Sequence, residues 1–534
     1  MIFSSIPFIF VFLPIALVGY YLLGAWRDRA AGGWLCVCSF VFYGYWNANF
    51  VWLLLASVLF NYAAGAALLR CDRGVNRTRV LIAAVGANLA LLFFYKYFGP
   101  AVGFLNVNGL GEWPAASIVL PLGISFFTFT QIAYLVDTAD GVVHERSWLN
   151  YILFVTFFPH LIAGPILHHR EIMPQFADRR TYRLNGENMA VGCSMFIFGL
   201  FKKAVIADQI GDFVPLAFDH SRSVDLVAAW TGVLAYAVQL YFDFSGYSDM
   251  AIGLARMFGV RFPINFNSPY KAANIVDYWQ RWHMTLTRWL TSYIYQPIVQ
   301  RIMRRRYARG EDLSPKGLKG TSAFLTMAVF PLMVTMGFAG IWHGAGLQFL
   351  CFGLLHGCYL SVHRAWRTFG RPTTGSLAPR SRLPSLLVRP WSVLLTFACV
   401  LVGQVFFRAD SVQGALQVLA GMIGLHAVVL PAYLIAALGD MGRELVSANI
   451  VVPGFAPNPF RAFLPILASL GITFLCPNTQ EIMALIPPRP RVPAEPGSPL
   501  LWAPTMPWAL AMGVMFFISL LLINNEQKFL YFQF

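Results

Sequence analysis

The sequence is dominated by apolar runs, many of them about as long as the 20 residues that a helix needs to cross a bilayer. The candidate spans lie at 5–24, 33–48, 50–69, 80–98, 116–136, 149–168, 189–216, 226–260, 321–339, 341–363, 391–408, 413–438, 462–476 and 506–524. Some of these runs are short or interrupted, so we expect about 11 to 13 transmembrane or re-entrant helices.

The composition supports a membrane protein built of helices. Hydrophobic residues make up 57% of the chain and charged residues only 12%, with a mean hydropathy of +0.60. A water-soluble domain has no core large enough for this apolar content. An outer-membrane barrel would need many more polar residues facing its lumen. The predicted fold class is therefore an all-α polytopic membrane protein.

Basic residues gather in the segments between the apolar runs. The chain has 39 Lys and Arg against 24 Asp and Glu, a net charge of +15. More than half of the Lys and Arg lie in five loops, at 27–29, 70–79, 170–183, 301–320 and 363–390. In a membrane protein such loops face the cytoplasm, and this topology signal is a better explanation of the charge than nucleic-acid binding.

The segment 321–363 lies between the two most basic loops. It must therefore leave the cytoplasmic face and return to it, and the Gly-rich stretch GFAGIWHGAG at 337–346 is the expected turn. His343 sits in that turn, at or beyond the middle of the membrane. A buried imidazole is driven toward its neutral form, which can accept a proton from a hydroxyl. The alternative role for His343 is a hydrogen bond between two helices.

His283 lies in the stretch NIVDYWQRWHMTLTRWLTSYIY. Treated as one continuous helix, the stretch places His283 on an apolar face, with Trp279 and Trp282, and Asp277 and Arg281 on a polar face. The tryptophans indicate a helix at the membrane interface. A titratable group among them favours a functional role for His283, with a simple interfacial anchor as the alternative.

Four other ionisable residues interrupt apolar segments. His356 follows His343 by 13 residues and is expected to be structural or to support another residue. His160 lies between Pro159 and Pro165, which predicts a broken helix facing protein or a water-filled cavity. Asp243 and Asp249 lie beside Ser and Gly, which suggests a helix break with capping rather than a proton relay.

Several signatures are absent from the sequence. There is no Walker A loop, dinucleotide fingerprint, HExxH or GxSxG motif. The eight cysteines lack the paired CxxC spacing of a zinc site, and we predict no metal site. Histidine chemistry is the remaining candidate. The proline-rich segment 479–505 is expected to be an extended loop.

Four motifs together resemble the membrane-bound O-acyltransferase family. They are LIAGPI at 161–166, QLYFDFSGYSDMAIGLARMFG at 239–259, NFNSPYKAANIVDYWQRWHMTLTRWL at 265–290 and GIWHGAGLQFLCFGLLHG at 340–357. The start MIFSS and the end FLYFQF are similar to the bacterial alginate O-acetyltransferase branch. The resemblance covers nearly the whole chain, and is loose beyond about residue 400.

The resemblance implies helices around a central tunnel, open to a cytosolic acyl thioester on one side and an extracytoplasmic acceptor on the other. His343 matches the family's invariant histidine and His283 the second histidine of this branch, so both are assigned to catalysis. A supporting set is assigned to substrate binding: Trp342, Trp279, Trp282, Asp243, Asp249 and His356.

The resemblance also implies an acetyltransferase of the bacterial inner membrane that uses acetyl-CoA and holds no bound cofactor. Its expected partners are an exopolysaccharide such as alginate, a periplasmic acetyltransferase- or esterase-like protein, and membrane lipids. We expect one membrane domain over 1–534, with N-terminal helices at 1–220, a catalytic core at 221–365 and C-terminal helices at 366–534. A D-alanyl transferase and a non-catalytic export or scaffold subunit remain alternatives.

Overall fold

The structure of the chain is a computed structural model, and helices dominate it. It describes residues 1–72, 74–111, 113–114, 118–143, 147–219, 224–312, 317, 320–370, 385–426, 428–430, 432–448, 450–453, 459–485, 501–523 and 530. Residues 486–500 of the predicted loop 479–505 lie outside these residues, as do residues 371–384 of the basic loop 363–390. The described part of the predicted loop is not all extended, because it starts with the short helix α25 (Thr479–Ile482).

The described residues contain seven helices that are long and apolar enough to cross a membrane. They are Phe8–Trp26, Asn49–Arg70, Val75–Lys96, Gly186–Gly211, Leu226–Met257, Thr321–His343 and Arg389–Arg408. Four shorter apolar helices accompany them, at Phe98–Val107, Val412–Met422, Arg461–Leu475 and Met506–Leu521. The predicted class, a helical multi-pass membrane protein, is confirmed.

The chain separates into two compact units. Unit 1 comprises Met1–Val205, Phe244–Asn265 and Thr479–Phe534, and unit 2 comprises Ile206–Asp243 and Phe266–Asn478. Two helices continue from one unit into the other along the chain, the π-helix η3 (Lys202–Ala207) and α13 (Leu226–Met257).

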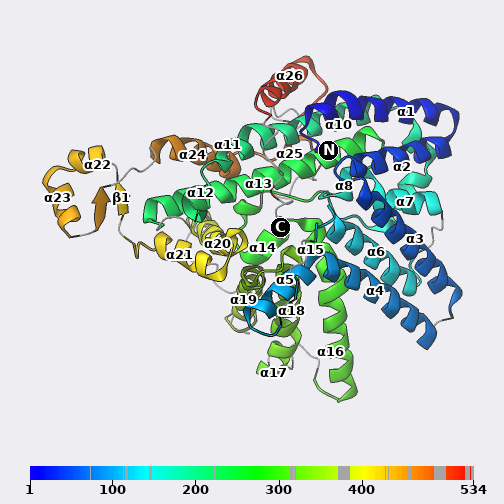
Figure 1. The fold of residues 1–534 in the computed structure, drawn as a ribbon, viewed down its shortest axis with the longest axis horizontal. Coiled ribbons are helices and arrows are strands. Elements are labelled where there is room, and N and C mark those ends of the chain that lie inside the picture. Colours follow the sequence, from blue (N-terminus) through cyan, green and yellow to red (C-terminus); the bar gives the residue numbers. More distant parts are fainter. Residues whose placement is uncertain are drawn as a thin grey trace. The chain divides into compact units, whose positions relative to one another are not determined.

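Unit 1 holds the N-terminal helices and the last ones (Figure 1). Its other elements are η1 (Phe8–Phe12), α1 (Leu13–Trp26), α2 (Asp28–Gly44), α3 (Asn49–Arg70), α4 (Val75–Lys96), α5 (Phe98–Val107), α6 (Ile124–Ala139), α7 (Trp148–Thr156), α8 (Phe158–Leu161), α9 (His169–Ala177), η2 (Arg179–Tyr182), α10 (Gly186–Phe201), α25 (Thr479–Ile482) and α26 (Met506–Leu521).

Unit 2 contains His283, His343 and His356. Its other elements are α11 (Asp208–Gly211), α12 (Pro215–Phe218), η4 (Pro269–Lys271), α14 (Ile275–Trp279), α15 (Met284–Leu290), η5 (Thr291–Tyr295), α16 (Gln296–Ala308), α17 (Thr321–Phe324), η7 (Leu325–Val329), α18 (Phe330–His343), α19 (Leu347–Phe369), α20 (Ser385–Arg408), α21 (Val412–Met422), β1 (Val428–Leu430), α22 (Ala432–Ala437), α23 (Gly439–Ser447), β2 (Val451–Pro453) and α24 (Pro459–Leu475).

In unit 1, α10 and the second half of α13 touch backbone to backbone. A Cβ added to Gly199 would lie 2.4 Å from the carbonyl oxygen of Gly246, and one added to Gly192 would lie 2.7 Å from that of Gly253. Only glycine permits so close an approach of two helices. One turn along each helix, Lys202 and Asp249 form an ion pair.

The predicted break near His160 is confirmed. Helix α7 ends at Thr156, and α8 starts at Phe158. Pro159 has no N–H to continue the α7 hydrogen bonds, and its ring would clash with the carbonyl four residues earlier. His160 is buried, as a broken helix facing protein requires.

One expected span is wrong. Instead of one helix over 413–438, α21 ends at Met422 and the short strand β1 follows, paired in parallel with β2. Gly424 adopts a φ of 75° just past the end of α21, and the amide of Leu425 bonds back to the carbonyl of Ala420. This glycine-dependent arrangement terminates helices. The prediction missed this helix end because the whole run is apolar.

Candidate functional site

His343 is the last residue of α18, and α19 starts four residues later at Leu347. The expected turn in the Gly-rich stretch is therefore confirmed. The two helices lie side by side in unit 2 (Figure 1). A Cβ on Gly340 would lie 2.2 Å from the carbonyl oxygen of Phe349, and one on Gly353 would lie 2.2 Å from that of Met336. Glycine thus lets the hairpin close tightly just before His343.

Aromatic rings surround the imidazole of His343, which is 8% exposed. Its ring centroid lies 4.8 Å from that of Trp342, 4.9 Å from that of Phe407 and 6.0 Å from that of Phe352. Trp342 was expected beside it, but Phe407 comes from α20, in the part of the chain where the family resemblance is loose. These surroundings are apolar, which suits a reaction that competes with hydrolysis.

The continuous helix assumed around His283 is wrong. Helix α14 ends at Trp279, a turn follows, and α15 starts at Met284. His283 itself has a φ of 42°, in the left-handed region that a residue with a Cβ rarely adopts. Such a conformation costs of order 1–3 kcal/mol and is found where the surrounding structure enforces it, often at functional sites. The apolar and polar faces derived for one continuous helix therefore do not apply to this segment.

The ion pair between Asp277 and Arg281 is confirmed, at 2.7 Å between carboxylate oxygen and Nε. The polar helix face expected for the pair is not found at Arg281, whose side chain is 10% exposed, whereas that of Asp277 is 30% exposed. Arg281 also donates to the carbonyl oxygen of Asn267 at 3.2 Å, and its own carbonyl accepts from the amide of Asn267 at 3.0 Å. These bonds hold the turn that ends at His283.

Trp342 lies close to both catalytic candidates. Its ring centroid is 6.5 Å from that of His283 and 4.8 Å from that of His343. His283 lies outside the seven candidate spans, is 1% exposed, and burial lowers its pKa to about 3. The neutral imidazole therefore prevails near pH 7.

His356 and Trp279 form a buried hydrogen bond. The indole N–H of Trp279 donates to Nδ1 of His356 across 3.2 Å. Phe352 lies 4.8 Å from His356, centroid to centroid, and also contacts His343. His356 thus has a defined structural partner, whereas its expected supporting role and the assignment of His356 and Trp279 to substrate binding stay predictions.

Trp282 is packed inside the protein rather than at a membrane surface. Its ring contacts Phe266 at 5.1 Å and Tyr278 at 5.8 Å between centroids, and it is 8% exposed. Trp279 is also buried, so the expected interfacial helix is wrong for both tryptophans. Phe266 contacts His283 as well, at 6.4 Å. Sequence spacing gave no signal for Phe266, which lies 17 residues before His283.

The expected helix break at Asp243 and Asp249 is wrong, since α13 is continuous from Leu226 to Met257. Both carboxylates are buried. Asp249 accepts from Lys202 Nζ and from Gln480 Nε2, each at 2.6 Å. Asp249 belongs to unit 1, and Asp243 and the histidines belong to unit 2. The assignment of Asp243 and Asp249 to substrate binding stays a prediction.

Comparison with known proteins identifies the family. Residues 34–309 match the membrane-bound O-acyltransferase family, a range that includes His283 and ends before His343. The chain is 34% identical over 568 residues to the probable alginate O-acetylase AlgI of Pseudomonas aeruginosa, covering 100% of both chains.

Two further relatives carry different names. The chain is 39% identical over 458 residues to the peptidoglycan O-acetyltransferase of Helicobacter pylori, covering 80% of this chain and 81% of the relative. It is 26% identical over 332 residues to the teichoic acid D-alanyltransferase of Bacillus subtilis, covering 61% and 77%. The chain belongs to the membrane-bound O-acyltransferase family and is an O-acyltransferase.

Proposed function

We propose that the protein acetylates a hydroxyl group of an extracytoplasmic polysaccharide, with cytosolic acetyl-CoA as the donor. The protein would act in the bacterial inner membrane, either on the polymer directly or through a periplasmic acetyltransferase- or esterase-like partner. The acetyl group and the polymer are supported by the names of the alginate and peptidoglycan acetylases, which match most or all of the chain.

The observation that carries the chemistry is the placement of two buried imidazoles around Trp342. In the proposed reaction, His343 accepts the proton of the acceptor hydroxyl while the oxygen attacks the thioester carbonyl. The carbon–sulfur bond breaks, an ester forms, and coenzyme A leaves as its thiol after taking up a proton. His283 would hold the thioester carbonyl by a hydrogen bond.

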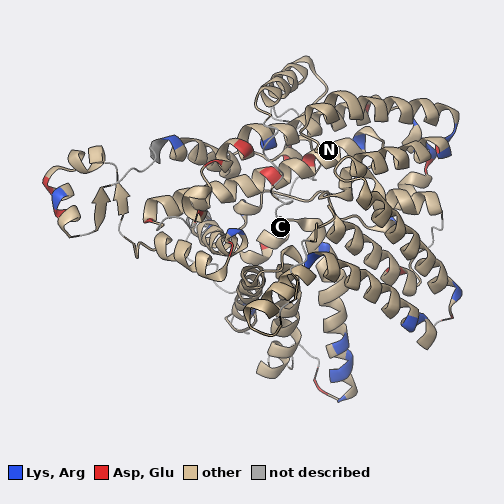
Figure 2. Cartoon of the chain, viewed as in Figure 1, with Lys and Arg blue, Asp and Glu red and all other residues tan. Residues whose placement is uncertain are grey.

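A basic helix supports an anionic donor. Figure 2 shows Lys and Arg gathered toward the C-terminal end of α16. Arg301, Arg304 and Arg305 are exposed there, whereas Arg306 pairs with Glu311 at 2.7 Å. Exposed guanidinium groups attract phosphates such as those of acetyl-CoA, provided that this loop is cytosolic as its charge predicts.

The test is acetyl-CoA turnover by the purified protein in lipid nanodiscs, together with NMR of polymer acetylation in cells. His343→Ala is expected to leave folding and membrane insertion intact and to abolish both signals. His363→Ala, a histidine outside the aromatic cluster, is the matched control. Retained polymer acetylation by the His343 variant would favour the scaffold alternative, and turnover with a D-alanyl thioester but not acetyl-CoA would favour the D-alanyl transferase.

A further inference from the structure

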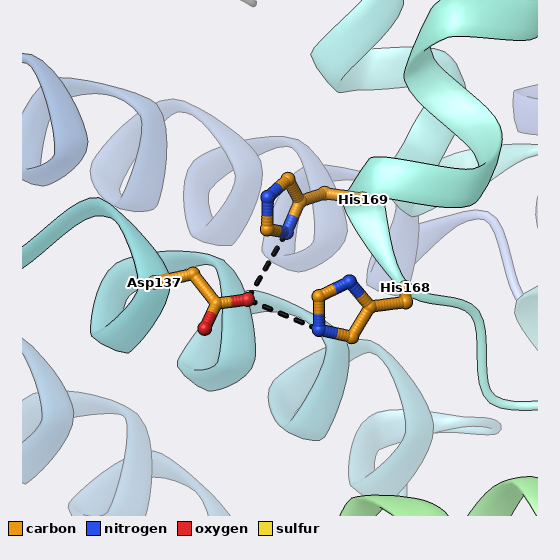
Figure 3. A group of neighbouring side chains, drawn as sticks. All are labelled: Asp137, His168 and His169. Carbon is orange, nitrogen blue, oxygen red and sulfur yellow. Dashed lines mark ion pairs between the residues drawn. The ribbon is translucent and has the colours of Figure 1, made fainter. Parts of the chain in front are cut away.

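Unit 1 contains a cluster of one carboxylate and two imidazoles that the acyl-transfer proposal does not use. Asp137 lies near the end of α6, and His168 and His169 lie at the start of α9 (Figure 3). Nε2 of His168 is 3.1 Å and Nδ1 of His169 is 3.2 Å from the same oxygen, Oδ2 of Asp137. The potential ligand atoms of the three residues all lie within 4.8 Å of one another.

From this arrangement we propose that Asp137, His168 and His169 bind a divalent transition-metal ion of the zinc class. Two imidazole nitrogens and one carboxylate oxygen form a donor set that Zn²⁺ and neighbouring divalent metals favour. In a tetrahedral zinc site with bonds of about 2.0–2.1 Å, neighbouring ligand atoms are about 3.3 Å apart. The two distances to Asp137 Oδ2 are already close to that value.

The hydrogen bonding of His169 supports an ion more than a simple polar cluster. Its side chain is 5% exposed, Nδ1 contacts the Asp137 carboxylate at 3.2 Å, and Nε2 has no hydrogen-bond partner among the residues that the structure describes. Buried imidazole nitrogens in proteins are normally hydrogen-bonded or bound to a metal. Coordination would use the lone pair of Nδ1, with the proton of the neutral ring on Nε2.

The end of α6 also favours a cation, whereas the start of α9, beside His168 and His169, carries the positive end of its helix dipole and opposes one. Asp137 lies in the last turn of α6, where the negative end of the helix dipole disfavours a lone carboxylate and favours a positive charge. The side chain of His168 is 24% exposed, whereas that of Asp137 is 12% exposed. The cluster is therefore open to solvent on the His168 side, where an ion can enter and water can complete its coordination. A bound ion would cross-link the end of α6 and the start of α9.

The proposal is tested on the full chain, purified without a histidine tag, stripped with a chelator and placed in nanodiscs. Calorimetry with Zn²⁺ should show one tight site per chain. Affinity at this site should fall by more than about tenfold in Asp137→Asn and in His168→Ala. The control variant His426→Ala, whose histidine lies in unit 2, should bind as the unchanged protein does.

A measurement on the unchanged protein guards against variants that fail to fold. X-ray absorption of the zinc-loaded protein should show nitrogen and oxygen ligands at about 2.0–2.1 Å with two imidazoles. Sulfur ligation would instead assign the zinc to some of the eight cysteines. The proposal would be overturned by sulfur ligation, by the absence of tight binding, or by Asp137→Asn and His168→Ala variants that bind Zn²⁺ as tightly as the unchanged protein. None of these readouts depends on acyl transfer.

Discussion

Trp279 donates its indole N–H to Nδ1 of His356 across 3.2 Å, within unit 2 and away from water. The bond makes Nδ1 the acceptor, so the proton of a neutral His356 sits on Nε2. Phe352 links His356 to the neighbourhood of His343, since its ring contacts both imidazoles. We therefore expect Trp279 and His356 to affect the candidate site by positioning its aromatic surroundings.

Trp279→Phe should destabilise the protein by about 1–3 kcal/mol, because it leaves Nδ1 of His356 buried without its donor. Unfolding in mixed detergent micelles measures the change. A double-mutant cycle with His356→Leu should show coupling, since the second substitution removes the group left unpaired. Additive effects would mean that the hydrogen bond contributes nothing beyond packing.

The two catalytic candidates should differ in their response to glutamine. Glutamine donates a hydrogen bond but cannot cycle a proton, so His283→Gln should retain more acetyl-CoA turnover than His343→Gln. His283→Asn is a useful companion, because asparagine tolerates the left-handed conformation at this position better than glutamine does. Equal loss in all three variants, at matched folding, would mean that both histidines transfer protons.

The topology prediction concerns the two most basic loops. Single cysteines at Gly310 and at Ser376, which lies outside the described residues, should resist an impermeant thiol reagent in intact cells and react in inverted vesicles. The native cysteines must first be replaced. Labelling of either position from outside would contradict the cytosolic assignment and the extracytoplasmic approach of the acceptor to His343.

The close contact between α18 and α19 gives a prediction of stability. Gly340→Ala should lower the free energy of unfolding by about 1–3 kcal/mol, because the new methyl group meets the backbone of α19. Gly337→Ala is the matched control on the same helix: its Cβ would lie 3.4 Å from the Leu354 side chain, and the change should stay within about 0.5 kcal/mol. Similar losses in both variants would point to glycine flexibility rather than contact.

The sequence was sufficient for the helical class and for the turn after His343. Apolar run length is a local property, and a Gly-rich stretch between two basic loops leaves few places for a turn. The same reasoning failed at His283, because its backbone conformation depends on the hydrogen bonds between Arg281 and Asn267, 14 residues apart. A helical wheel contains no such contact.

The sequence also did not predict side-chain contacts between residues that lie far apart along the chain. Trp279 and His356 are 77 residues apart, and Gln480 donates a hydrogen bond to Asp249, 231 residues earlier in the chain. The pair His168–His169 has no spacing typical of a metal site, and its carboxylate comes from another helix. Such contacts follow from helix packing, which one sequence does not specify.

The backbone contact between α10 and α13 determines where charge can be buried in unit 1. Lys202 and Asp249 each lie three residues beyond a glycine of that contact, Gly199 and Gly246. A methyl group at Gly199 would push the helices apart and separate two charges that water cannot readily reach, and breaking a buried pair costs far more than one methyl group's packing. The electrostatics of this region therefore depend on two residues that carry neither charge nor side chain.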